Sequence, residues 1–216
     1  MGENKIFPKV FLWLFVGLLV SGVTAFYVSN QPNMMYNIYE ENWYFWLVLA
    51  ELAVVIFLSA RIHKMSHMTA IISYLLYSIL TGTTLSVIFA AFTTGSIAIV
   101  FGITALIFAI FAMIGYTTKA DLSKWTNILL IGLLAVIIVG IINIFIGSDM
   151  VALVTSIITV ILFIGFIAYD IQKIKYLTTV MDDENKIAII GALELYLDFI
   201  NIFIHLLSIF GRRDYK

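Results

Sequence analysis

Seven long apolar stretches divide this sequence, and they constrain its fold more than any other feature. A helix needs about 20 mostly apolar residues to cross the hydrocarbon core of a bilayer. Such stretches occur at residues 8–28, 43–60, 69–91, 97–117, 126–146, 150–177 and 186–210. Short turns connect several of them, at residues 30–33, 93–96, 147–149 and 182–185. We therefore expect an all-α integral membrane protein of seven transmembrane helices, folded as a single domain over residues 1–216.

The composition excludes several other classes of protein. Hydrophobic residues make up 62% of the chain and charged residues 12%, whereas soluble domains have about 45–50% and 25%. A soluble fold of this length cannot bury so much apolar surface, so the lipid bilayer is its expected partner. A net charge of −1 gives no reason to expect a nucleic acid. The absence of cysteine excludes disulfides and thiolate metal sites.

Lysine and arginine predict the orientation, because cytoplasmic loops of membrane proteins are enriched in them. The N-terminal segment and the second, fourth and sixth connections hold Lys5, Lys9, Arg61, Lys64, Lys119, Lys124, Lys173, Lys175 and Lys186. The other connections hold none, so we expect a cytoplasmic N-terminus. Seven crossings then put Arg212, Arg213 and Lys216 outside. Either these late charges are tolerated, or the last stretch enters the bilayer without crossing fully.

The last apolar stretch carries the strongest chemical signal. Its polar residues follow one another at intervals of four, three, four and three, which places them on one helical face. They are Glu194, Asp198, Asn201, His205 and Ser208. An ionisable group in the bilayer core is costly unless it faces protein or water, so we expect the last helix to be central in the bundle. The face is either part of an ion path or a buried polar network that holds the helices together.

Asp170 adds a second aspartate in the preceding stretch, where the apolar pattern continues beyond it. Consecutive membrane helices are antiparallel, so a modest tilt can bring Asp170 close to Asp198. Two carboxyl groups in one low-dielectric site cannot easily both ionise, so one keeps a proton and the pair responds to pH. Alternatively, Asp170 lies at the membrane surface beside Lys173 and Lys175.

The second stretch contributes a carboxylate at its centre and a cation at its end. Glu51 has no cation near it in sequence and is a candidate for the ion path, since a glutamate at this depth is usually functional. It could also be a protonated, hydrogen-bonded group. The guanidinium of Arg61 suits bidentate pairing with carboxylates, or it extends to lipid phosphates.

These residues lie in segments that resemble the Bax inhibitor-1 family. The segments are AYDIQ at 168–172 and ALELYLDFINIF at 192–203, with weaker support from GYTTKADL at 115–122. The resemblance implies seven helices with the last one central, and a leak that passes calcium and responds to pH. It implies that Asp170 and Asp198 are the proton-sensing pair, that Arg61 is its latch, and that Glu51 is the acidic position of the second helix. His205 has no counterpart in the family pattern.

We accordingly expect a pH-gated, calcium-permeable channel without cofactor or enzymatic activity, located in a bacterial inner membrane. Carboxylate oxygens are suitable ligands for the permeating calcium, so Asp170 and Asp198 are possible calcium contacts. One alternative is an intramembrane aspartyl protease, although the Gly-x-Gly-Asp pattern of such enzymes is absent at Asp198. Another is a proton-coupled transporter. Transporters usually show inverted repeats or paired broken helices, and the two prolines, Pro8 and Pro32, both lie near the first stretch. The sequence gives neither ion selectivity nor oligomeric state.

Overall fold

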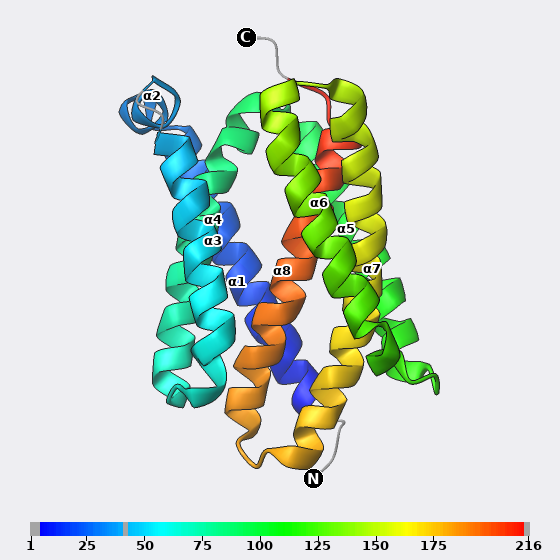
Figure 1. The fold of residues 1–216 in the computed structure, drawn as a ribbon. Coiled ribbons are helices and arrows are strands. Elements are labelled where there is room, and N and C mark those ends of the chain that lie inside the picture. Colours follow the sequence, from blue (N-terminus) through cyan, green and yellow to red (C-terminus); the bar gives the residue numbers. More distant parts are fainter. Residues whose placement is uncertain (1–4, 41–42, 214–216) are drawn as a thin grey trace. The chain divides into compact units, whose positions relative to one another are not determined.

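The structure, a computed structural model, describes residues 5–40 and 43–213, and this part of the chain contains helices and no β-strand (Figure 1). The α-helices are α1 (Ile6–Ser29), α2 (Pro32–Glu40), α3 (Trp43–Arg61), α4 (His67–Ala91), α5 (Thr94–Thr117), α6 (Thr126–Ile146), α7 (Asp149–Val180) and α8 (Glu184–Phe210). Two short 3-10 helices, η2 (Ile62–Lys64) and η3 (Leu122–Trp125), precede α4 and α6. All α-helices in the described part except α2 are long and apolar enough to cross a membrane. The predicted all-α protein with seven membrane-spanning helices is confirmed.

The predicted helices agree with the observed ones to within three residues at each end. The predicted turns, however, are too long. Residues 30–33 were expected to form a turn, but Pro32 begins the short helix α2, because proline fits the first turn of a helix, where its missing N–H is not needed. Likewise α5 begins at Thr94, α7 at Asp149 and α8 at Glu184. Residue types that favour turns also favour helix N-termini.

The helices form two compact units. The first holds α1 to α4 and the part of α8 up to Tyr196, and the second holds α5, α6, most of α7 and the part of α8 from Leu197. α8 is one uninterrupted helix that contributes to both. The single-domain organisation expected for residues 1–216 stays a prediction.

In the first unit, α1 packs along α4 through small residues. A β-carbon added to Gly82 would come within 2.6 Å of the Ser21 carbonyl oxygen, so the two backbones nearly touch there. At the start of α8, the Lys9 ammonium lies 2.8 Å from the Glu184 carboxylate. At its other end, Arg213 pairs with Phe92 after α4. α8 has 27 residues and is long and apolar enough to cross a membrane, which favours the full crossing over a partial one.

In the second unit, glycines allow the helices to approach closely. Leu162 of α7 packs against Gly132 of α6, and Leu129 of α6 packs against Gly165 of α7. Aromatic rings join α5 to α8, with the Phe101 and Phe199 centroids 5.1 Å apart. Such packing of small and aromatic residues replaces the hydrophobic effect, which does not drive association between helices inside lipid.

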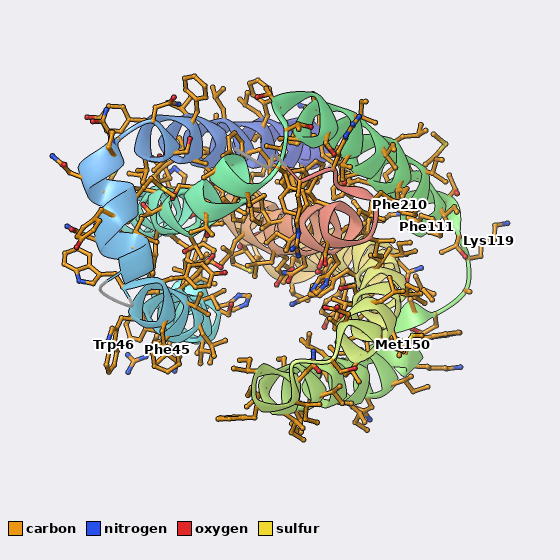
Figure 2. All side chains as sticks on the ribbon, turned by 90° about the horizontal axis from the view of Figure 1, so that it is seen from above. Phe45, Trp46, Phe111, Lys119, Met150 and Phe210 are labelled. Carbon is orange, nitrogen blue, oxygen red and sulfur yellow. The ribbon has the colours of Figure 1, made fainter. Side chains whose placement is uncertain are left out.

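Burial separates α8 from the other spans. In its most apolar stretch 78% of the residues are buried, against at most 39% in each other span within residues 5–40 and 43–213. The figure falls to 11% in the second span, which begins with α3, and to 6% in the one that includes α6. Figure 2 shows Phe45 and Trp46 of α3 pointing outward. These two helices therefore present apolar side chains to lipid, whereas protein covers α8.

Candidate functional site: the carboxylates of α7 and α8

Asp170 and Asp198 are both buried, with 7% and 3% of their surfaces exposed. Both belong to the second unit, Asp170 on α7 and Asp198 on α8. Residues 181–183 connect these antiparallel helices. Measured from this connection, Asp170 lies about 15 Å along α7 and Asp198 about 21 Å along α8, at 1.5 Å per residue. The two aspartates thus lie at similar depths in neighbouring helices.

The sequence of α7 explains why Asp170 is buried. It stands three residues after Ile167 and four before Ile174, both with 0% exposure, so it shares their helical face. The close approach of α5 fixes this part of α7, because Gly115 lies against the backbone of Ala168. The helix continues three residues farther than predicted, to Val180. Asp170 therefore lies deeper than the sequence indicated, and not at the end of its helix.

The polar face of α8 is also its least covered face. Glu194, Asn201 and His205 are half-buried, whereas most residues on the other faces between Leu193 and Leu207 are buried. The Asn201 side-chain amide donates to the Leu197 carbonyl oxygen at 2.7 Å. His205 Nδ1 lies 3.1 Å from the Ser156 hydroxyl of α7, within the second unit. Since lipid cannot solvate such groups, this face is suited to contact with water or ions.

Glu51 lies in the first unit, half-buried on α3. Its carboxylate is close enough to the Tyr77 and Tyr196 phenols to interact with them electrostatically. Hydroxyl groups surround this region: Ser21 lies 2.5 Å from the Tyr196 phenol oxygen and donates to the Ser78 carbonyl oxygen at 2.8 Å. Glu51 therefore lies near the buried phenols of α4 and α8 within this unit.

Further hydroxyl groups of α4 belong to the same region. Tyr74 donates to the Trp13 carbonyl oxygen at 2.9 Å, which joins α4 to α1, and Ser78 donates to the Tyr74 carbonyl oxygen of its own helix at 3.0 Å. The sequence analysis missed Ser21, Tyr196 and Ser156. A signal existed for Ser21, which follows Gly17 by four residues in the first apolar stretch, so that two small residues share one helical face.

Arg61 is the last residue of α3 and is exposed. Its guanidinium carbon lies 5.9 Å from the centroid of the Phe57 ring, one turn earlier in the same helix. It belongs to the first unit, and the two aspartates belong to the second. Its pairing with Asp170 and Asp198 stays a prediction. Within the described residues, no three or more His, Asp or Glu side chains gather to hold a metal ion.

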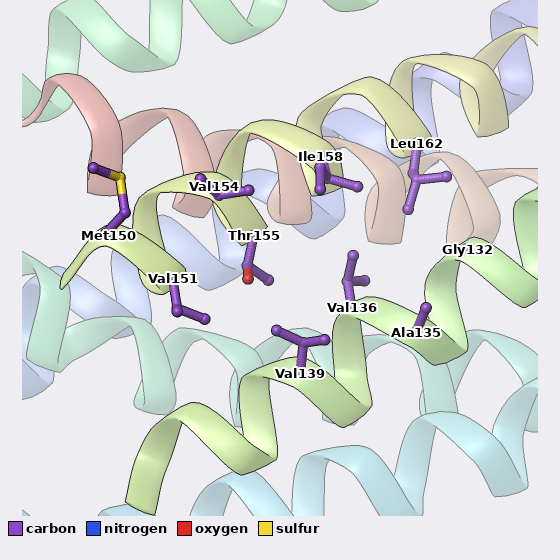
Figure 3. Close-up of a pocket in the computed structure, with 10 residues that line it drawn as sticks. All are labelled: Gly132, Ala135, Val136, Val139, Met150, Val151, Val154, Thr155, Ile158 and Leu162. Carbon is purple, nitrogen blue, oxygen red and sulfur yellow. The ribbon is translucent and has the colours of Figure 1, made fainter. Parts of the chain in front are cut away.

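Two apolar pockets lie within the second unit. The larger, of about 420 Å³, lies between α6 and α7, and Thr155 is its one hydroxyl-bearing residue (Figure 3). The smaller, of about 210 Å³, lies where α5, α6 and α7 meet near η3. Neither pocket includes any of the predicted site residues among the side chains that line it.

The fold and the buried carboxylates define a class of protein: an integral membrane protein of seven helices with ionisable groups in its interior. The family model described as "Inhibitor of apoptosis-promoting Bax1" matches residues 3–214. The chain therefore belongs to the Bax inhibitor-1 family, which confirms the resemblance inferred from the sequence.

Three bacterial relatives match nearly the whole chain. It is 40% identical to the inner membrane protein YbhL of Escherichia coli K12, over 98% of this chain and 93% of YbhL. It is 39% identical to an uncharacterized protein of Borreliella burgdorferi, over 98% and 93% of the two chains. It is 30% identical to the uncharacterized protein RP147 of Rickettsia prowazekii, over 98% and 91%.

Proposed function

We propose that this protein is a pH-gated leak channel for calcium in a bacterial inner membrane, with its N-terminus in the cytoplasm. The observation that carries the proposal is the burial of Asp170 and Asp198 on neighbouring membrane-spanning helices of one unit. Buried acidic groups at this depth mark ion or proton pathways in membrane proteins. The E. coli relative named as an inner membrane protein supports the location.

Calcium is the permeating ion in this proposal, and carboxylate and amide oxygens are its preferred ligands. Glu51 attracts it in the first unit. On α8, Glu194, Asn201 and His205 provide polar contacts along the least covered face. Asp170 and Asp198 contact the ion at the gate, and no resident metal or cofactor is needed.

The gate depends on protons. Two carboxyl groups at similar depth share one proton more easily than they carry two charges. While the pair is negative, Arg61 binds it and holds the path closed. Acidification neutralises the pair, weakens its attraction to Arg61 and favours opening. The closed state is thus stabilised at higher pH and loses that stabilisation as the pair takes up its second proton.

The proposal assigns a conducting role to the aspartates and no enzymatic one. An aspartyl protease would also need two adjacent carboxyl groups, but in addition a substrate cleft between them. A proton-coupled carrier would need two alternating states. The channel, the carrier and the protease differ in what they do to a calcium gradient, so flux separates them.

The test is calcium flux into liposomes that contain the purified protein, measured from pH 8 to pH 5 with a calcium-sensitive dye inside. We expect a flux that increases at acidic pH and rises linearly with the calcium gradient. A flux that saturates and moves protons in a fixed ratio would establish the carrier instead. No flux at any pH, from protein shown to be folded, would refute the channel.

A further inference from the structure

The smaller apolar pocket has no role in the proposed channel, and the residues in and around it change from apolar to polar to charged along one direction. It is bounded by Phe111 and Ile114 of α5, Leu129 of α6, and Ile164 of α7, all of which lie within membrane-spanning helices. The volume of about 210 Å³ is filled neither by a side chain nor by backbone. Gly165 also borders it, at the point where Leu129 packs against α7.

The mouth of this pocket is polar and aromatic. Thr118 and Trp125 line it at the ends of α5 and α6, and tryptophan prefers the boundary between lipid tails and headgroups. The connecting loop is held in place by Gln172 of α7, whose side chain accepts from the Leu122 N–H at 3.1 Å and donates to the Ala120 carbonyl oxygen at 2.8 Å. The mouth is therefore an ordered part of the second unit.

Lysines lie beyond the mouth. Lys119 and Lys124 are exposed on the connecting loop, and Figure 2 shows Lys119 pointing outward. The loop also carries Asp121, whose carboxylate accepts from the Ser123 N–H at 3.0 Å and from the Ser123 hydroxyl at 2.6 Å. The loop keeps a net positive charge, since it holds two lysines and one aspartate.

From the helix interiors towards the loop, the apolar wall of the pocket is followed by the tryptophan at its mouth and then by the positively charged lysines. A phospholipid has its parts in the same order, from the acyl chains to the charged headgroup. We propose that this pocket binds one anionic phospholipid, with an acyl chain between Phe111, Leu129 and Ile164 and its phosphate near Lys119 and Lys124. Basic pockets between helices on the cytoplasmic side of membranes bind anionic headgroups in this way. No charged side chain lines either pocket, but Thr118 and Trp125 of the smaller one are followed and preceded in the chain by Lys119 and Lys124. No residue that lines the larger pocket between α6 and α7 has a lysine or arginine next to it in the chain.

The test uses the full-length protein in detergent with equal amounts of phosphatidylglycerol and phosphatidylcholine, and native mass spectrometry counts the bound lipids. We expect one phosphatidylglycerol to be retained with a preference on the order of tenfold, from two lysines near the headgroup. The K119Q/K124Q double variant should lose the preference. The matched K5Q/K64Q double variant, which removes two charges outside the pocket, should keep it. Equal preference in K119Q/K124Q and in the unaltered protein would overturn the proposal.

A second variant and a competitor separate the parts of the site. Ile164→Trp fills the pocket and should abolish the retained lipid while leaving the melting temperature of the protein nearly unchanged. Glycerol 3-phosphate carries the charge without acyl chains and should not displace the lipid. Displacement by glycerol 3-phosphate, or full retention in Ile164→Trp, would show that the apolar pocket is not the binding site. Neither lipid-binding test measures calcium flux, so the lipid site and the proposed channel can be refuted independently.

Discussion

Gly115 of α5 lies directly against Ala168 of α7, so close that an added β-carbon would come within 2.5 Å of the Ala168 carbonyl oxygen. Backbones of membrane helices approach this closely only through small residues. Asp170 follows Ala168 by two residues on the same helix. The glycine therefore fixes the segment of α7 that positions the buried aspartate.

Replacing Gly115 by alanine should destabilise the protein by about 1–3 kcal/mol, the usual cost of overpacking, although alanine favours helix by about 1 kcal/mol. Gly102→Ala on the same helix is the matched control, because an added β-carbon there meets nothing within 4 Å. Thermal unfolding in detergent compares the two variants. Equal melting temperatures would show that α5 and α7 are not held at this contact.

Tyr196→Phe should cost about 1 kcal/mol, which is typical of a hydrogen bond between membrane helices, because it removes the contact of Tyr196 with Ser21 of α1. The control is Tyr27→Phe, since Tyr27 is 58% exposed. Both variants keep the ring, so the difference in melting temperature reports the hydroxyl alone. If the Tyr196→Phe protein is as stable as the Tyr27→Phe protein, the buried hydroxyl cluster does not contribute to the stability of the fold.

Glu51→Gln should lower calcium flux on the order of tenfold, because a carboxylate beside a low-dielectric path concentrates cations. The substitution keeps the shape and the polarity of the side chain, so the melting temperature should change little. Asp182→Asn removes an equal charge from the exposed connection between α7 and α8 and serves as the control. Unchanged flux in folded Glu51→Gln would assign this residue to packing with Tyr77.

Asp170→Asn and Asp198→Asn, singly or together, should abolish the response of the flux to pH. Asparagine keeps the hydrogen-bonding capacity near that of a protonated aspartate but cannot ionise, so the path should conduct as if already protonated. His205→Gln, on the same face of α8, is expected to leave the response in place. A double variant that still responds to pH would locate the sensor elsewhere, with His205 as the next candidate.

Arg61→Gln should give a leak that is open at every pH, because nothing then holds the charged pair. Lys64→Gln removes a neighbouring charge and should behave like the unaltered protein. Flux at pH 8, where the gate is closed, gives the clearest comparison. If Arg61→Gln stays closed at pH 8, the arginine contacts lipid phosphates or the Phe57 ring and does not latch the gate.

The helices could be predicted well because their length and apolar composition are set by the thickness of the bilayer. α2 was missed because its nine residues are too few to cross and begin with a proline that also suits a turn. The division of α8 between two units could not be predicted. Helices surrounded by lipid and by protein have similar apolar composition, so hydropathy does not reveal which ones pack together.

The helical face that carries the candidate residues of α8 could be predicted from the sequence, the contacts of their side chains could not, and their roles stay predictions. The spacing of Glu194, Asp198 and Asn201 gave the polar face of α8, because helical periodicity is read directly from sequence. The depth of Asp170 was underestimated, since residues 178–180 continue α7 without an apolar pattern. The partner of His205, Ser156, lies 49 residues earlier in the chain, and no local pattern connects them.

The continuity of α8 across both units has a consequence for biosynthesis. Tyr196 and Leu197 are adjacent residues of one helix, yet they complete different halves of the protein. Domains generally fold from the N-terminus as the chain is made, but here neither half has all its segments until the last span leaves the ribosome. That span also carries Asp198 and Glu194, and an acidic residue such as aspartate at a helix centre opposes insertion by about 2.5–3.5 kcal/mol. The earlier helices must therefore surround the last span as it inserts, and both halves of the protein complete their folding in one late step.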